Sequence, residues 1–298
     1  LPDLATLLSP SFDIFDYAAS NFINKYDVLP VAAMVIFDDV LRNVDLPERR
    51  KRDLRSSLQK FAEAVELGYN NAPFHNPIHA TDVALALYML ISEKEPLLDP
   101  MLSIICYCAA LGHDINHPGY SNWYAILNCD GDEDDTHPLE TMHARETIRL
   151  LEETGVAEFI EKESLQLIEK MILGTDMQVH NMWVEKAKEY EECSLEDRLT
   201  ILLHAADLCN PTRTRTAMLK WSALILEEFG HERDLFFAQG KQPPKAIPTR
   251  ADCPKAYLQI QLGFFRKLVE PLNIRSRWEV LAIYEAEALD SKDLAVAE

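Results

Sequence analysis

Three short clusters of histidine and aspartate supply the side-chain types that proteins use to bind metal ions. His75 and His79 lie four residues apart at the start of an apolar stretch, so a helix would place both side chains on one face. An adjacent pair, His113 and Asp114, ends a second apolar run, and Asp207 ends a third. An ionised carboxylate in such a place needs a compensating charge, and a metal ion is the simplest one.

Four of these residues form a mixed set of nitrogen and oxygen ligands, namely His79, His113, Asp114 and Asp207. Two imidazoles and two carboxylates suit zinc with a position left for water. A carboxylate can also bridge two ions, so a harder second ion, magnesium or manganese, is predicted beside the zinc. A hydrogen-bonded core network without metal is the alternative for the same residues.

Three further polar side chains follow in the sequence. His117 lies one turn after His113, and Glu140 and His143 lie three residues apart on a helix that begins near Pro138. We predict that His117, Glu140 and His143 orient the metal ligands and metal-bound water through hydrogen bonds. For Glu140 and His143, an exposed pair on a helix surface is the alternative.

A glutamine interrupts an apolar helical face near the C-terminal end. Gln261 lies on one side of that helix together with Tyr257, Phe264 and Leu268. The edge of a purine would satisfy the Gln261 amide, so Gln261 and Phe264 together suggest a pocket for a base. The alternative is a glutamine that reaches solvent beside a phenylalanine of the core.

The elements that position these residues are predicted to be helices. The 298-residue chain is 48% apolar with nine glycines, and its apolar residues recur at three- and four-residue spacing. These features predict an all-α fold, a compact multi-helix domain over residues 1–298. Helical runs are predicted at 31–43, 50–68, 78–92, 97–112, 138–153, 157–173, 195–208, 214–230 and 254–270. Ser194 with Asp197 resembles a capping box, and Gly155 is typical of a helix end.

Charge and composition argue against several classes of partner. A net charge of −20 disfavours a nucleic-acid polymer, whose phosphates need clustered lysine and arginine. The longest apolar run, Met101 to Leu111, falls short of the roughly 18–20 residues that cross a bilayer.

Six cysteines without a CxxC pair predict free thiols in a reducing, cytoplasmic compartment. Because the chain begins with Leu1, we expect a catalytic part of a longer protein, with regulatory domains absent from this chain.

Three motifs together resemble the class I cyclic nucleotide phosphodiesterases, a family of HD-type metal phosphohydrolases. The signatures HN-x-x-HA-x-DV, HD-x-x-HPG-x-x-N and H-x-ADL-x-NP occur in this order. The resemblance runs from about Phe74 to Phe264, and the flanking helical patterns agree in character. It implies that nearly the whole chain is one catalytic domain of that family, with a dinuclear metal site at the bottom of a pocket.

The resemblance implies a role for each residue of the metal clusters. His79, His113, Asp114 and Asp207 would bind the tighter, zinc-like ion, and Asp114 would bridge to a second ion held largely by water. His75 would be the general acid. Water between the two ions would attack phosphorus while His75 protonates the departing 3′ oxygen, releasing a nucleoside 5′-monophosphate.

The resemblance also implies a substrate pocket. Asn210 would contact the nucleotide and Gln261 would hydrogen-bond the purine. Ile225 and Phe264 would clamp the two faces of the base. Met218 stands in the stretch that often fixes the glutamine, which would leave the amide free to match adenine or guanine. We therefore expect hydrolysis of 3′,5′-cyclic nucleotides, with cAMP favoured and cGMP open as a second substrate.

A carboxylate near the general acid would keep that histidine protonated. By alignment with the family, Glu228 is the candidate that raises the pKa of His75. Phe74 departs from the commonest family pattern, in which a tyrosine precedes the acid, and it removes a hydroxyl from the site.

Three other functions remain as alternatives. Another HD-type nucleotidase would act on mononucleotides, but His75-Asn76 and the pair of Gln261 and Phe264 speak against it. A non-catalytic sensor of cyclic nucleotides would have no need of the complete ligand set and the acid. A structural scaffold would leave the carboxylates at the ends of apolar helices unexplained.

Overall fold

The computed structural model describes residues 3–9, 11–21, 28–128, 136–244 and 263–272, and these form helices and turns without a strand. The α-helices are α1 Leu4–Leu7, α2 Ile14–Asn21, α3 Val28–Leu41, α4 Glu48–Gly68, α5 Pro77–Lys94, α6 Pro100–Gly112, α7 Asn122–Leu127, α8 Pro138–Glu153, α9 Lys162–Leu173, α10 His180–Ala187, α11 Leu195–Asp207 and α12 Arg215–Ala238. The predicted all-α class is confirmed.

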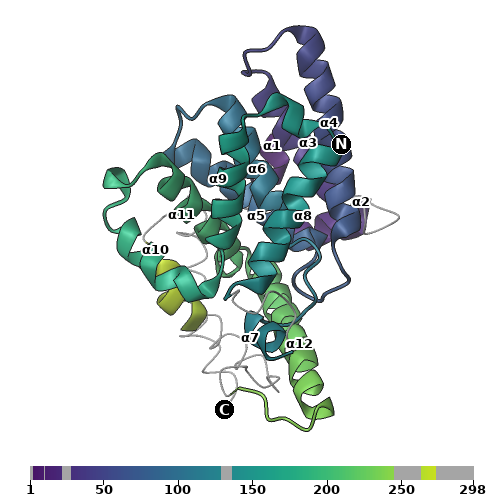
Figure 1. Ribbon diagram of the computed structural model, residues 1–298, viewed down its shortest axis with the longest axis vertical. Helices are drawn as coiled ribbons and strands as arrows, with labels where there is room; N and C mark the ends of the chain where they lie inside the picture. The colour runs from purple at the N-terminus through teal and green to yellow at the C-terminus, as the bar shows by residue number, and fades with distance from the viewer. Residues whose placement is uncertain (1–2, 10, 22–27, 129–135, 245–262, 273–298) are drawn as a thin grey trace.

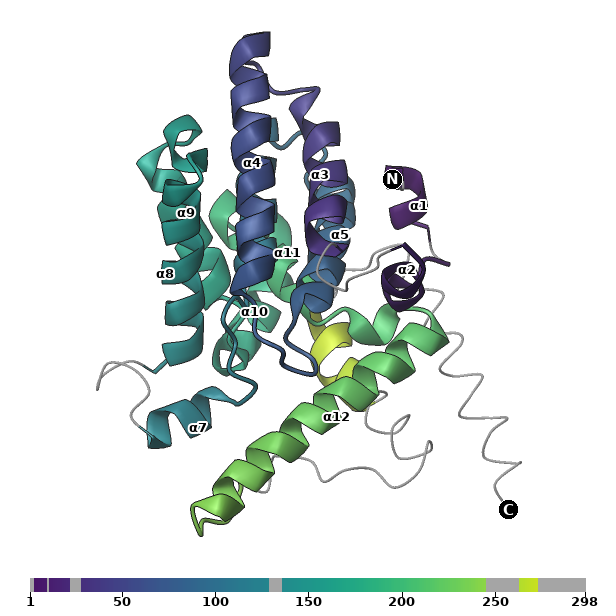
Figure 2. The same cartoon turned by 90° about the vertical axis from the view of Figure 1, so that its right-hand side faces the viewer.

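Helices α5 and α6 lie in the middle of the bundle, where α5 contacts α3, α6 and α11, and α6 contacts α8 and α9 (Figure 1). Nearly every side chain of α6 is buried, which explains its uninterrupted apolar sequence. Helix α12 crosses the lower end of the bundle, and α4 rises above the other helices (Figure 2). Two of the metal-ligand candidates, His113 and Asp114, therefore follow a helix whose side chains are almost all buried.

The ends of α5 and α6 set the positions of the candidate site residues. The Asn76 side chain accepts hydrogen bonds from the backbone N–H groups of Ile78 and His79, and Pro77 occupies the first position of α5. This cap leaves His75 just outside the helix and places His79 in its first turn. Helix α6 ends at Gly112, so that His113 and Asp114 follow directly.

Three of the sequence-predicted helices differ from the structure. The run predicted at 214–230 continues to Ala238 as α12. The run predicted at 157–173 is divided into a 3₁₀ turn, Val156–Phe159, and α9, because Ile160 and Glu161 take extended conformations. The run predicted at 254–270 lies partly outside the described residues, and its described end forms a π-helix, Phe265–Val269, followed by a 3₁₀ turn, Glu270–Leu272. The prediction also missed α1, α2, α7 and α10.

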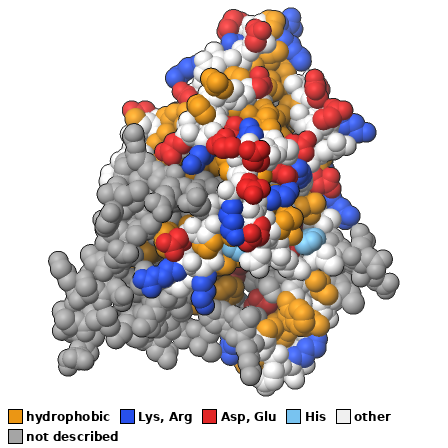
Figure 3. All heavy atoms as spheres, turned by 90° about the vertical axis from the view of Figure 1, so that its left-hand side faces the viewer, with side chains coloured by type: hydrophobic (Ala, Val, Ile, Leu, Met, Phe, Trp, Pro, Cys, Tyr) orange, Lys and Arg blue, Asp and Glu red, His pale blue; other side chains and the backbone are white. Residues whose placement is uncertain are grey.

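Two expectations about helix ends hold within the described residues. The Ser194 side chain accepts a hydrogen bond from the Asp197 N–H at the start of α11, and Gly155 follows α8 with a φ of +80°. None of the described helices is both long and apolar enough to cross a membrane. On the face drawn in Figure 3, acidic and basic side chains of the described residues are interspersed, and the basic ones do not gather into one surface.

Close packing of α6 against α8 requires glycine at position 112. A Cβ atom there would lie 2.2 Å from Oγ1 of Thr147, whose hydroxyl donates a hydrogen bond to the Gly112 carbonyl. We expect Gly112→Ala to lower the free energy of unfolding by about 1–3 kcal/mol through overpacking. Denaturant unfolding of the metal-free protein measures this.

Gly230 provides the matched control, because a Cβ atom at this position of α12 would meet nothing within 4 Å. Gly230→Ala should raise the free energy of unfolding by about 0.5–1 kcal/mol, since alanine restricts the unfolded chain. Equal stability of the two variants would contradict the packing argument.

Candidate active site

The four predicted metal ligands converge from three helices. His79 comes from α5, His113 and Asp114 follow α6, and Asp207 ends α11. Nε2 of His79 lies 3.0 Å from Oδ1 of Asp207 and 3.4 Å from Oδ2 of Asp114. Nε2 of His113 lies 3.3 Å and 3.1 Å from the same two atoms. Neighbouring ligands of one ion are separated by about this much when each lies roughly 2.0–2.2 Å from it, so the donor atoms fit a single metal ion.

The charge balance of this cluster also fits a cation. Both imidazoles are fully buried, and the side chains of Asp114 and Asp207 are 12% and 19% exposed. Burial acts to lower the pKa of His113, but the charges of Asp114 and Asp207 hold it well above its ordinary value. A positive charge between the carboxylates is therefore strongly favoured.

Hydrogen bonding sets the tautomer of one of the two histidines. Nδ1 of His113 lies 2.8 Å from the carbonyl oxygen of Ala110 and donates to it, which directs Nε2 toward the carboxylates. Nδ1 of His79 is buried and has no hydrogen-bond partner among the described residues. The two imidazoles are thus held in different ways.

His75 forms an ion pair with Glu228, which α12 brings to the site from the lower end of the bundle. Nδ1 of His75 hydrogen-bonds Oε1 of Glu228, and Oε2 of Glu228 accepts from the backbone N–H groups of Phe74, at 3.0 Å, and His75, at 3.2 Å. Burial acts to lower the pKa of His75, but the charges of Glu228 and Asp114 raise it to about 9. His75 is therefore a charged acid at neutral pH, and it faces the cluster of metal-ligand candidates.

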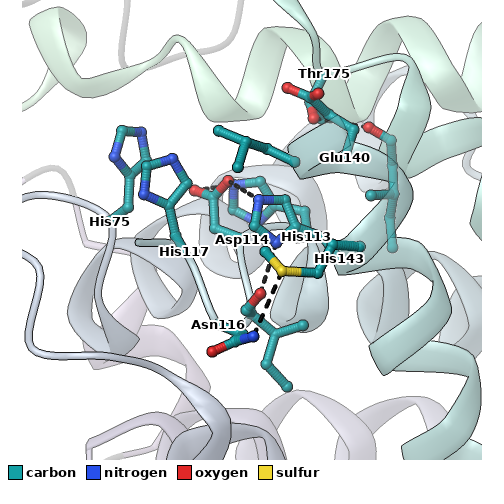
Figure 4. A network of polar contacts seen from close by, with 12 residues as sticks. His75, His113, Asp114, Asn116, His117, Glu140, His143 and Thr175 are labelled. Atoms are coloured by element: carbon teal, nitrogen blue, oxygen red, sulfur yellow. Dashed lines mark hydrogen bonds and ion pairs between the residues drawn. The ribbon is translucent and has the colours of Figure 1, made fainter. Parts of the chain in front are cut away.

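Two further histidines extend the cluster (Figure 4). The ring of His117 stacks on that of His75, with centroids 3.9 Å apart, and its Nδ1 accepts from the N–H of Gly119. Nδ1 of His143 donates to the carbonyl of Ile115, which leaves Nε2 3.9 Å from Oδ1 of Asp114. Burial lowers the pKa of His143 to about 4, so its ring is neutral at neutral pH.

Glu140 belongs to a polar group that sequence reasoning only partly found. Oε2 of Glu140 accepts a hydrogen bond of 2.7 Å from Asn122, which also donates to Asp176. Burial and the charge of Asp176 raise the pKa of Glu140 to about 7. His137 pairs with Asp176. Asp176 was missed although it ends an apolar run in the same way as Asp114.

A buried ion pair next to Asn210 was missed altogether. Arg213 donates to Asp82 through Nε, at 3.1 Å, and through a terminal nitrogen, at 2.9 Å, and both side chains are at most 4% exposed. The Asn210 amide donates to the same Asp82 carboxylate at 3.4 Å. The pair joins α5 to the turn that follows Asp207.

Comparison with known proteins decides the family. The profile of the 3′,5′-cyclic nucleotide phosphodiesterase family matches residues 74–277, more than half of the chain. The chain belongs to this family. A dual specificity calcium/calmodulin-dependent 3′,5′-cyclic nucleotide phosphodiesterase 1B from Cricetulus griseus is 29% identical over 234 residues, which cover 72% of this chain and 43% of that protein. A probable 3′,5′-cyclic phosphodiesterase, pde-1, from Caenorhabditis elegans is 27% identical over 240 residues, 74% of this chain and 35% of that protein.

A solved structure shares the fold of this phosphodiesterase family member. The phosphodiesterase domain of the RhoPDE fusion protein from the choanoflagellate Salpingoeca rosetta superimposes with a TM-score of 0.77 at 23% identity, covering 99% of this chain and 95% of that one. The chain spans less than half the length of the curated relatives described above.

The predicted substrate pocket is described only in part. Gln261 lies outside the described residues. Ile225 packs against the cluster around Phe74 and Trp221, whereas Phe264 packs against the main core. The clamp formed by Ile225 and Phe264 therefore stays a prediction.

The Asp82–Arg213 pair should be essential for stability. Asp82→Ala removes the buried carboxylate that Nε and a terminal nitrogen of Arg213 contact, so we expect the free energy of unfolding to fall by about 3–5 kcal/mol. Asp38→Ala is the control, because it removes a partner of Arg55 where both side chains are at least 40% exposed, and it should cost at most about 1 kcal/mol. Comparable losses measured by denaturant unfolding would contradict the assignment.

Proposed function

We propose that this phosphodiesterase hydrolyses 3′,5′-cyclic nucleotides to nucleoside 5′-monophosphates with two divalent metal ions. One observation carries the proposal: four donor atoms spaced for a single ion, two of them on fully buried imidazoles, lie beside a histidine whose pKa is raised by the charge of Glu228. A metal cluster and an acid side by side are the groups that hydrolysis of a phosphate ester needs. Membership of the family supports the same reaction.

The metal ions would be held by the chain's own buried ligands. His79, His113, Asp114 and Asp207 would hold zinc, and Asp114 would also help to hold magnesium or manganese. Bound there, the ions would supply activated water and neutralise charge on the phosphoryl group.

His75 would protonate the leaving group. Because Nδ1 of His75 is engaged by Glu228, its Nε2–H is the proton available to the departing 3′ oxygen. The stacked ring of His117 limits the orientations open to His75. Glu228 also accepts hydrogen bonds from the backbone N–H groups of Phe74 and His75, which fix the position of its carboxylate.

Polar neighbours would orient the water that attacks. The neutral ring of His143 lies near Asp114, and Glu140 is held by Asn122 on the neighbouring helix. We assign His117, Glu140 and His143 to hydrogen bonds with the ligands or with water in the site.

The substrate side of the proposal rests on family resemblance. Asn210 would contact the nucleotide, Gln261 would hydrogen-bond the purine, and Ile225 and Phe264 would clamp the base. We favour cAMP and include cGMP, and the name of the Cricetulus griseus relative, with its dual specificity, supports testing both.

The proposal extends to the whole chain. We assign residues 1–298 to one catalytic domain of a longer, regulated protein. Cys106, Cys108 and Cys193 are free thiols, and this supports a cytoplasmic location.

Metal reconstitution tests the activity directly. Metal-stripped protein should produce no 5′-monophosphate from cAMP or cGMP, and zinc with magnesium or manganese should restore production. His75→Ala and Asp207→Ala should each lower kcat by at least about 100-fold under the same conditions. Tight nucleotide binding without turnover would favour the sensor, and cleavage of mononucleotides alone would favour a nucleotidase.

The ion pair of His75 and Glu228 predicts a pH effect. The acid works while His75 is protonated, so activity should be lost as pH rises through the pKa of about 9. Glu228→Gln removes the charge that raises this pKa, and the alkaline limb of kcat/KM should move to lower pH by about one unit or more. An unchanged limb and unchanged activity would exclude Glu228 from this role. Glu227→Gln, at an exposed neighbouring position, is the control.

A further inference from the structure

Two aromatic rings pack against the imidazole of His79. Its Nδ1 is buried without a hydrogen-bond partner among the described residues. The centroid of the His79 ring lies 4.6 Å from that of Phe74 and 5.7 Å from that of Trp221. The rings of Phe74 and Trp221 are themselves 5.3 Å apart and nearly perpendicular. His79 therefore lies against two rings that also contact each other.

The need for this packing follows from the unpartnered nitrogen of His79. A histidine that binds a metal through one nitrogen usually donates from the other to a carbonyl or carboxylate, which fixes the plane of the ring. His113 does so through Ala110, but buried Nδ1 of His79 has no such partner among the described residues. Besides the contact of Nε2 with the carboxylates and the neighbouring rings of His75 and His113, the ring of His79 is held by its packing against Phe74 and Trp221.

Helix α2 closes the aromatic group from the far side. The ring of Phe15 lies 4.6 Å from that of Trp221, and Ile14 is buried in the same cluster. Lys220, next to Trp221 in the chain, forms an ion pair of 3.1 Å with Asp16 and lies over the ring of Phe15. Figure 2 shows α2 beside the first turns of α12. Trp221 is 1% exposed, so its ring has no room to move while Phe15 is in place.

We propose that Phe15, Trp221 and Phe74 form an aromatic brace that positions the metal ligand His79, so that helix α2 tunes the affinity of the site for zinc. The inference rests on the proposed role of His79 as a zinc ligand. The brace residues are not among the metal-ligand candidates, and they act through the orientation of one imidazole. Any displacement of α2 would lower the affinity of the site for zinc.

Zinc affinity of the metal-stripped protein, measured by competition with a chromophoric chelator, tests the brace without substrate. Phe15→Ala should weaken zinc binding by roughly 10-fold or more, the effect typical of losing a group that orients a metal ligand. Phe15→Tyr keeps the ring and should bind zinc like the unmodified protein. Trp221→Phe, which keeps a smaller ring, should show an intermediate loss.

Leu8→Ala is the matched control, because Leu8 is a half-buried residue of the same N-terminal segment but packs against the main core. It should leave zinc affinity unchanged, and thermal unfolding of the metal-free variants should confirm that all are folded. Unchanged zinc affinity in Phe15→Ala, or an equal loss in Leu8→Ala, would overturn the brace even if the enzyme is active. An inactive protein whose zinc affinity still falls in Phe15→Ala would keep the brace and lose the proposed hydrolysis.

Discussion

The structure depends on two carboxylates placed at the ends of apolar helices, beside two imidazoles that solvent does not reach. Asp114 and Asp207 each lie within 3.4 Å of both His79 and His113. Burying such charges is costly unless an opposite charge lies among them. The fold meets this cost by bringing both carboxylates together with the two imidazoles, where the mutually contacting helices α5, α6 and α11 converge.

Helix ends perform most of the positioning. The cap of Asn76 leaves His75 outside α5 and places His79 in its first turn, so that His75 pairs with Glu228 while His79 lies between Asp114 and Asp207. The end of α6 delivers His113 and Asp114 together, and Asn116, with a φ of 63°, turns the chain so that His117 comes back over the cluster. A side chain at a helix end can face the site while the helix itself stays in the core.

Structure could be predicted from the sequence where the residues next to a side chain in the chain indicate whether it is buried. The helical class, the capping box at Ser194 and the convergence of the metal-ligand candidates all follow from apolar runs and the polar residues that end them. The Asp82–Arg213 pair was not predictable, because its members are 131 positions apart and nothing local marks them as partners. The break at Ile160 was missed for a similar reason, since no glycine or proline stands there. Helix α2 is short, and its packing on Trp221 depends on tertiary contacts.

His79 and Asp207 are 128 positions apart, and they meet only when α5 and α11 are packed together. The unfolded chain therefore has no assembled set of ligands, and a zinc ion would bind the native state almost exclusively. Mass action would then add about 2.7 kcal/mol to stability when free zinc exceeds its dissociation constant 100-fold. A cell short of zinc would hold a larger unfolded fraction of this chain within reach of its proteases, so the supply of the ion would set how long each molecule survives.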